Sequence, residues 1–172
     1  MSEENQVDAA AAAPEANKMQ FALQRMYIKD VSFESPQGYK AFQGEWKPEV
    51  NLDLNMGRDA VDDNNWEVTL SLTITVKNAE ETAFLIEIHQ AGIFLCGGME
   101  EEQRRYVLNT TCAEILFPYA REAVDNLVTK GGFPALMLSP INFQALYQQA
   151  MAQRADQEAK AGTAEGGADA TH

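Results

Sequence analysis

The sequence contains few of the side chains from which catalytic and metal sites are usually built. There are only two cysteines, Cys96 and Cys112, and two histidines, His89 and His172. Two scattered cysteines are too few for a disulfide framework or a zinc site, so we expect both to be reduced and buried. No spacing pairs a cysteine with a histidine, and neither Gly-Gly pair has the lysine of a phosphate-binding loop. We therefore expect no enzymatic activity, no metal and no cofactor.

Basic residues are also scarce. The 13 lysines and arginines are outnumbered by 26 aspartates and glutamates, which gives a formal net charge of −13. This charge argues against nucleic acid and anionic membranes as partners and favours a basic protein or peptide. No apolar run approaches the roughly 18 residues of a membrane span, and the start, "MSEENQVDAAAAAPEANK", lacks the basic region of a signal peptide. We expect a cytoplasmic protein that does not insert into membranes.

The two ends of the chain differ in composition from its middle. Both are rich in alanine and acidic residues and hold too few apolar side chains to offset the entropy lost on ordering. We predict a disordered acidic tail at residues 1–18, one folded domain at 19–154 and a second disordered tail at 155–172.

Alternation of apolar and polar residues predicts four strands in the first part of the domain. They lie at 21–33, from Trp46 to Met56, at 66–76 and at 81–98. Pro48 donates no hydrogen bond, so the start of the second strand must be a sheet edge or a crossover loop. The links are short, with a turn at 57–65, and they predict an antiparallel meander.

A period of three to four residues then replaces the alternation. It predicts one long helix from Glu100 to Lys130, with a kink or break at Pro118. A short helix follows, for which Asn142 is a plausible N-cap. The fold class is therefore α+β, a four-stranded antiparallel sheet with one long and one short helix.

The apolar residues exceed what such a two-layer monomer can bury. The main stripe of the long helix holds Leu108, Cys112, Ile115, Leu116, Tyr119, Ala123 and Leu127, yet more apolar residues lie off this stripe: Val107, Phe117, Ala120, Val124 and Val128. Leu85 adds to them, because it lies on the polar face of the fourth strand. Self-association with two-fold symmetry is the simplest way to cover this surface.

The predicted domain contains four distinctive segments, "WKPEVNLDL", "FLIEIHQAGIF", "ILFPYAREAV" and "GGFPALMLSPINFQALY". Together they resemble the SecB family of bacterial protein-export chaperones. The likeness covers about residues 20–152 and leaves out the tails. It implies a SecB-like fold that forms a homotetramer, a dimer of dimers, with no ATPase activity of its own. It also implies a function, which is to hold precursor proteins in an unfolded, translocation-competent state and deliver them to the SecA ATPase of the Sec pathway.

The resemblance implies a role for Leu85 on the second face of its strand. In the family an acidic and apolar patch on the sheet binds the basic, zinc-binding C-terminal tail of SecA, and the matching residues here are Asp30, Glu34, Leu85 and Glu87. Leu85 would supply the apolar contact, and the carboxylates would attract and orient a cationic module. Ile86 should point to the other face. The alternative is that Leu85 is buried in the oligomer and the acids are merely solvated.

The resemblance also implies a groove for unfolded precursor chains. The family's groove lies between the crossover from the first to the second strand and the short helix, and the matching residues are Phe42, Trp46, Val50, Leu52, Leu54, Phe143, Leu146 and Tyr147. Apolar burial is non-directional, so a groove of this kind suits a promiscuous binder. The alternative is that some of these residues, Leu52, Leu54 and Trp46 among them, belong to the ordinary core.

A second hypothesis for the function stays open beside the export chaperone. The same fold would serve a SecB-like chaperone or scaffold that is dedicated to one partner, such as an antitoxin. A general holdase binds many unfolded chains, whereas a dedicated scaffold binds one, so binding to denatured precursors separates the two.

Overall fold

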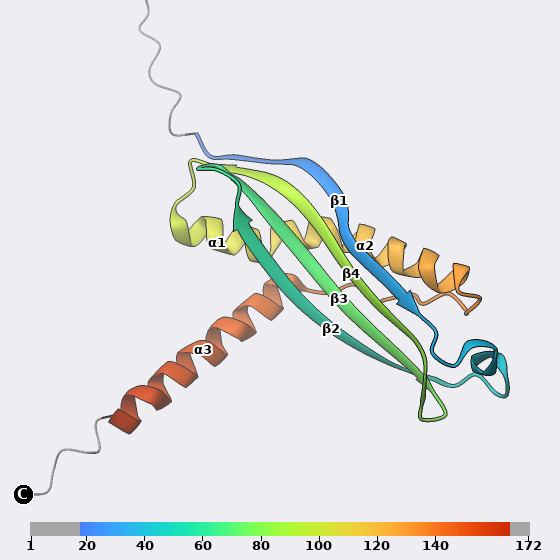
Figure 1. Cartoon of the computed structure of the whole chain (residues 1–172). Coiled ribbons are helices and arrows are strands. Elements are labelled where there is room, and N and C mark those ends of the chain that lie inside the picture. Colours follow the sequence, from blue (N-terminus) through green and yellow to red (C-terminus); the bar gives the residue numbers. More distant parts are fainter. Residues whose placement is uncertain (1–17, 166–172) are drawn as a thin grey trace, which may run out of the picture.

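Four antiparallel strands form one sheet, and helices lie along only one of its faces (Figure 1). The computed structural model describes residues 18–165. The elements in chain order are β1 (Gln20–Glu34), the 3-10 helix η1 (Gly38–Phe42), β2 (Pro48–Ala60), β3 (Asn65–Asn78), β4 (Glu81–Gly97), α1 (Glu101–Asn109), α2 (Thr111–Lys130) and α3 (Phe143–Glu165). The predicted α+β fold class is confirmed.

The order of the strands differs from the predicted meander. The sheet has the order β1-β4-β3-β2, so β1 pairs with β4 and not with its neighbour in sequence. The link from β1 to β2 contains η1 and passes around the end of the sheet (Figure 1), which carries the chain from one edge strand to the other. Pro48 is the first residue of an edge strand, as predicted, where its missing N–H is harmless.

The turn predicted at 57–65 is shorter in the structure. Strand β2 continues to Ala60, because Gly57, Arg58 and Asp59 still pair with β3. The remaining turn is closed by Asp62, whose carboxylate accepts hydrogen bonds from the backbone N–H groups of Asn64 and Asn65. These bonds, led by that from the Asn65 side chain, hold the pKa of Asp62 below its usual range.

The predicted long helix is divided, but not at Pro118. The break falls at Thr110, which separates α1 from α2 and has φ −119° and ψ −73°. The Thr110 hydroxyl donates to the Tyr106 carbonyl oxygen, so this threonine caps the end of α1 with its side chain. Pro118 lies inside α2.

The face of α2 that packs on the sheet combines residues of the main stripe with residues that lie off it. The buried side chains are Cys112, Ala113, Leu116, Phe117, Ala120, Val124 and Val128, which include most of those predicted to lie off the main stripe. They pack against β3 and β4, whose helix-side residues form most of the rest of the core. Ile115, Tyr119, Ala123 and Leu127 are less buried, so α2 keeps a second apolar stripe away from the sheet.

The last helix is longer than the short helix we expected. Asn142 is its N-cap, since the side-chain oxygen accepts the backbone N–H of Ala145 at 2.9 Å. Helix α3 then runs to Glu165, beyond the domain end predicted at 154, through an alanine-rich segment of high helix propensity. Residues 1–17 and 166–172 of the predicted tails lie outside the described residues.

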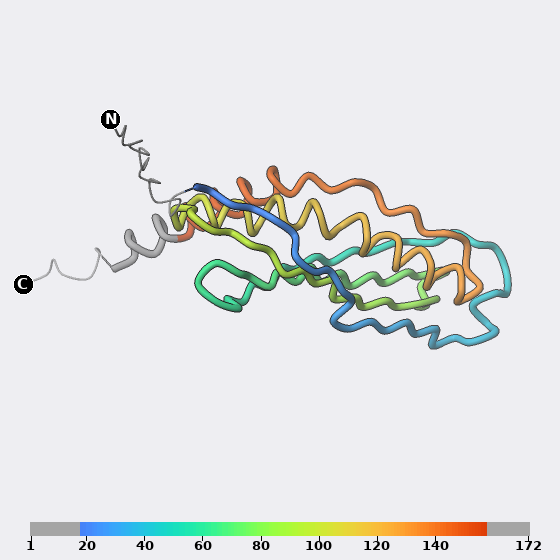
Figure 2. The backbone as a smooth tube through the Cα atoms, turned by 90° about the horizontal axis from the view of Figure 1, so that it is seen from above, coloured from blue at the N-terminus to red at the C-terminus, as the bar shows by residue number. Residues whose placement is uncertain are grey.

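The core includes both cysteines, which are free and buried as predicted. Cys96 lies on β4, on the face that the helices cover, and Cys112 lies at the start of α2. In Figure 2 the helix layer and the segment that joins α2 to α3 lie on one side of the sheet, and the opposite face is uncovered.

Gly92 allows α2 to approach the sheet closely. A Cβ atom at this position would lie 2.8 Å from Cε2 of Phe94 and 3.0 Å from Cδ2 of Leu116, and both side chains are fully buried. Gly92→Ala is therefore expected to lower the free energy of unfolding by about 1–3 kcal/mol, as measured by urea unfolding at fixed protein concentration. Gly57→Ala is the matched control, because its Cβ meets nothing closer than 3.8 Å. Equal stability of the two variants would contradict the close packing.

Candidate functional site

The uncovered face of the sheet brings together the residues predicted to bind SecA. Phe84, Ile86 and Ile88 of β4 point to the helices and are buried, so Leu85 and Glu87 point to the opposite, outer face. The prediction for Ile86 is confirmed. Strand β1 places Asp30 and Glu34 on the outer face as well, because residues paired across an antiparallel ladder share a face.

The register of the strands puts an acid directly beside Leu85. Glu34 is the β1 partner of Leu85, and Thr75 is its partner on β3. Glu87 is the next outward residue on β4, and Asp30 lies opposite His89 one step further. Leu85 is half-buried, whereas the three carboxylates are exposed. We call Asp30, Glu34, Leu85 and Glu87 the docking surface.

A further carboxylate lies in the same part of the outer face, and the sequence reasoning missed it. Asp53 on β2 is the partner of Thr73, which is in turn the partner of Glu87. Paired residues share a face, so Asp53 points outward and extends the acidic region across the sheet. The alternation of β2 already placed Asp53 on its polar face, but only the strand order brings it near Glu87.

Next to the docking surface, Tyr27, Lys29 and Glu67 form a hydrogen-bonded cluster on the same face. The Tyr27 hydroxyl donates to one carboxylate oxygen of Glu67, and the Lys29 amine bonds the other. These two bonds, that from Lys29 first, hold the pKa of Glu67 below its usual range. The carboxylate is therefore ionised at neutral pH. The pKa of Tyr27 is raised, chiefly by its bond to Glu67.

On the helix side, an aromatic cluster forms one end of the predicted client groove. Phe133 is at its centre, with its ring centroid 4.8 Å from Phe42, 5.6 Å from Trp46 and 4.7 Å from Phe84. Phe42 and Trp46 line a cavity of about 160 Å³ with Phe133 and Pro134. Sequence reasoning missed Phe133, because it lies in the irregular "GGFP" segment, where no periodicity marks it.

The other predicted groove residues lie along β2 and at the start of α3. Val50, Leu52 and Leu54 face the helix side, since they pair with Val76, Ile74 and Leu72 of the core. Val50 is exposed, whereas Leu52 and Leu54 are half-buried against the core. The structure thus brings Phe42 and Trp46 together, while the α3 residues lie at the far end of the segment that follows Phe133.

The three α3 residues differ in their surroundings. Phe143 is buried, with its ring edge-on to Phe117 at a centroid distance of 5.8 Å. Tyr147 is half-buried and meets Tyr106 of α1 in a similar way at 5.6 Å. Leu146 is exposed. Of the three, Leu146 therefore offers the most surface to a bound chain.

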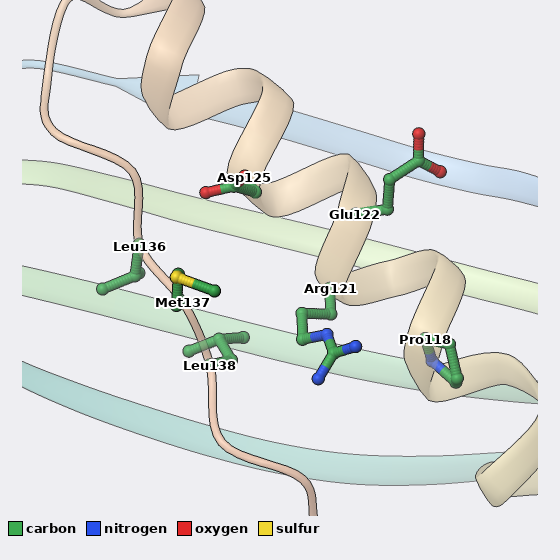
Figure 3. A pocket seen from close by; sticks show the side chains of 7 residues that line it. All are labelled: Pro118, Arg121, Glu122, Asp125, Leu136, Met137 and Leu138. Atoms are coloured by element: carbon green, nitrogen blue, oxygen red, sulfur yellow. The ribbon is translucent and has the colours of Figure 1, made fainter.

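A second hollow lies on the helix side, where α2 faces the segment that leads to α3. It has a volume of about 300 Å³ and is lined by Pro118, Arg121, Glu122, Asp125, Leu136, Met137 and Leu138. Figure 3 shows Arg121 and Asp125 directed toward the segment that carries the three apolar residues. One oxygen of Asp125 is buried without a hydrogen-bond partner among the described residues. A ligand with an N–H group would satisfy it.

Two features are absent from the part of the chain that the structure describes. Within residues 18–165 no three His, Cys, Asp or Glu side chains are grouped in a way that would hold a metal ion. None of the helices in that range is long and apolar enough to cross a membrane.

These surfaces define a class of protein. A sheet with one open, acidic face and with hollows partly lined by apolar side chains on its helix side is suited to binding other polypeptides by burial and charge. The sequence matches the family described as "Preprotein translocase subunit SecB" over residues 14–154. The chain belongs to the SecB family, and its function is that of a protein-export chaperone of the Sec pathway.

Individual relatives agree with this assignment. The protein-export protein SecB of Marinobacter nauticus is 51% identical over 150 residues, which cover 87% of this chain and 91% of the relative. That of Hahella chejuensis is 55% identical over 139 residues, or 81% and 87% of the two chains. Among solved structures, this chain is similar to the SecB-like chaperone of Mycobacterium tuberculosis, which was solved in complex with a peptide from an antitoxin. The two match with a TM-score of 0.59 and 22% sequence identity. The match covers 71% of this chain and 91% of the other. This last likeness concerns the fold alone.

Proposed function

We propose that the chain acts in the cytoplasm as a homotetrameric holdase. It binds unfolded precursor proteins in the groove on its helix side and delivers them to SecA, whose zinc-binding C-terminal tail binds the docking surface. The observation that carries the proposal is the position of the two surfaces. The groove and the docking surface lie on opposite faces of one sheet, so a precursor and the motor can be bound together.

The charges of the docking surface support a basic partner. In the part of the chain that the structure describes, the ion pairs are Lys29–Glu67 and Lys47–Glu45, and neither includes Asp30, Glu34 or Glu87. These exposed carboxylates attract cations over about 8–10 Å at physiological salt. Leu85 adds an apolar contact in their midst, which gains free energy once a partner excludes water from it.

The apolar side chains left uncovered in one chain support the tetramer. The β1 stripe consists of four exposed apolar residues on the helix side of an edge strand: Phe21, Leu23, Ile28 and Val31. An edge strand with such a stripe is a ready surface for a second copy. The second apolar stripe of α2, which holds Ile115, Tyr119, Ala123 and Leu127, offers another. Two different self-complementary surfaces are what a dimer of dimers needs.

The client groove can be tested with the triple variant Phe42→Ser, Val50→Ser, Leu146→Ser. All three side chains are exposed, so the fold should tolerate the changes. One interfacial anchor is typically worth about 2 kcal/mol, but a long redundant groove should reduce each single effect below roughly 1 kcal/mol. We expect the triple variant to weaken capture by about 30–100-fold, or roughly 2–3 kcal/mol, in titrations with several unrelated denatured precursors.

The matched control is Val61→Ser, which alters a side chain as exposed as Phe42, 56% in both cases, but in the β2–β3 turn. It should bind precursors as the unaltered protein does. Unchanged capture by a folded triple variant would rule out this groove. Binding of a single partner, with no affinity for the panel of denatured chains, would instead favour the dedicated scaffold.

A further inference from the structure

Strand β1 has an irregularity beside the docking surface. Its register with β4 shifts between Ile28 and Asp30, so Lys29 has no partner in the ladder. A bulge of this kind lets two consecutive residues share one face. Asp30 points outward because it pairs with His89, and Lys29 also points outward because its amine reaches Glu67 on the outer face of β3. The bulge therefore places a lysine directly next to an acid of the docking surface.

Lys29 is nevertheless turned away from that acid. Its amine forms an ion pair with Glu67, two strands away, and the Tyr27 hydroxyl bonds the other oxygen of the same carboxylate. Both side chains extend over β4 at Ala91, the partner of Tyr27 on the outer face, and Ala91 is completely buried. A small residue at this position leaves room for the two side chains to cross.

The consequence of this geometry is electrostatic. A lysine side chain is long and flexible, and its amine moves to the nearest unpaired carboxylates if its partner is removed. The other carboxylates of this face are Asp59, the β2 partner of Glu67, whose charge already acts on the Lys29 amine, and two acids of the docking surface, Asp30 and Glu87. An amine held at Asp30 or Glu87 would neutralise part of the docking surface and repel an approaching cationic module.

We propose that Glu67, fixed by Tyr27, is a positioning residue for the docking surface, which holds Lys29 away so that the carboxylates remain free for a basic partner. The inference rests on the proposed function of that surface. Glu67 does not itself contact the partner in this scheme. It acts through Lys29, and removal of Lys29 should therefore make Glu67 dispensable.

The test is calorimetric titration with the zinc-loaded, basic C-terminal tail peptide of SecA at low salt. Glu67→Gln should weaken binding by about 5–10-fold, because the neutral amide no longer holds the Lys29 amine in an ion pair. The double variant Lys29→Gln, Glu67→Gln should return to within about twofold of the unaltered protein. This double variant has the same net charge as the unaltered protein, so its recovery cannot come from a change in overall charge.

Asp59→Asn is the matched control, since Asp59 is the β2 partner of Glu67 and is also a carboxylate of the outer face. It removes the same charge without freeing the Lys29 amine from Glu67 and should change affinity by less than about twofold. Lys29→Gln alone should also lie within about twofold, because the paired amine contributes little. Equal effects of Glu67→Gln and Asp59→Asn would overturn the inference, as would a several-fold gain from Lys29→Gln.

The same titration separates this inference from the function on which it rests. Glu87→Lys alters the docking surface directly. If Glu87→Lys weakens binding and Glu67→Gln does not, the docking surface stands and the positioning role of Glu67 is wrong. If neither variant changes the affinity, the docking surface itself is wrong. If Glu67→Gln lowers the melting temperature, the double variant decides the positioning role, because it also lacks the Glu67 carboxylate and recovers affinity only if the Lys29 amine caused the loss.

Discussion

The double substitution Ile28→Glu, Val31→Glu is expected to dissociate the proposed tetramer. Four chains of 19.0 kDa give a particle of about 76 kDa, and the variant should elute as dimers or monomers in light scattering across a range of concentrations. Both side chains belong to the β1 stripe and are 47% and 41% exposed in the single chain. Each buried aliphatic side chain is worth about 1.5–3 kcal/mol, and a two-fold interface contains every residue twice. The loss should therefore exceed roughly 5 kcal/mol per interface.

The folded chain itself should survive this change. The two residues lie at the sheet edge, where a glutamate can reach water once the partner is gone. Val61→Glu is the control, because it adds the same charged side chain at an exposed apolar position in the β2–β3 turn. It should leave the particle mass unchanged. If the Ile28, Val31 variant keeps a mass near 76 kDa, then β1 is not an interface of the tetramer.

Leu85→Arg is expected to abolish most of the binding of the zinc-loaded SecA tail peptide. The change removes the apolar contact, worth about 1.5–2 kcal/mol, and adds a positive charge among Glu34, Glu87 and Asp30. Together these effects should weaken binding by about 100-fold, or roughly 3 kcal/mol. Glu87→Lys should cost about 1–3 kcal/mol through charge reversal alone. Raised salt should weaken the complex of the unaltered protein, since exposed charges are screened.

Leu95→Arg provides a close control for this experiment. Leu95 is also an outward-facing leucine of β4, since it pairs with Ala22 and Asn65, but it lies ten residues further along the strand. At about 3.3 Å per residue the two positions are roughly 33 Å apart. Leu95→Arg should leave peptide affinity unchanged, and neither variant should impair capture of precursors. If Leu85→Arg instead dissociates the tetramer, Leu85 belongs to a subunit interface and not to a docking surface.

The faces of the strands could be predicted from the sequence, but not their neighbours. Alternation of side chains fixes which residues share a face, and β3 follows this rule from Val68 to Val76, where the alternate residues are buried. The order of strands depends on non-local pairing, for which alternation carries no information. The link between β1 and β2 contains only a short helical turn and irregular residues. No pattern in it predicts that the chain crosses to the opposite edge of the sheet.

The helix was predicted as an element, but the face that packs on the sheet was not. The chain from Leu108 to Val128 carries two apolar stripes, and periodicity alone does not say which one packs on the sheet. The break was misplaced for a related reason. Proline is the strongest local signal for a break, yet the helix is divided at Thr110. The side-chain bond of Thr110 to the Tyr106 carbonyl does not distinguish this position, because Thr129 makes the same kind of bond inside α2.

The candidate site was predicted in part. The resemblance identified the four residues of the docking surface, and the register brings Glu34 beside Leu85. Their role in binding stays a prediction, as do the client groove and the domain boundaries. The sequence analysis missed Phe133, Asp53 and Glu67, because the neighbours of each residue in space lie on a distant strand or loop. No local pattern marks a residue whose partners lie dozens of positions away in the chain.

Strand β4 has one more consequence for how an export chaperone transfers its cargo. Consecutive residues of this strand belong to different surfaces, since Phe84 packs against Phe133 in the aromatic cluster and Leu85 belongs to the docking surface. If the proposed groove and docking surface are both correct, the aromatic cluster at one end of the groove is joined to the docking surface through neighbouring residues of a single strand. Binding of the motor peptide at Leu85 that shifts β4 would then also move Phe84 and, through it, Phe133.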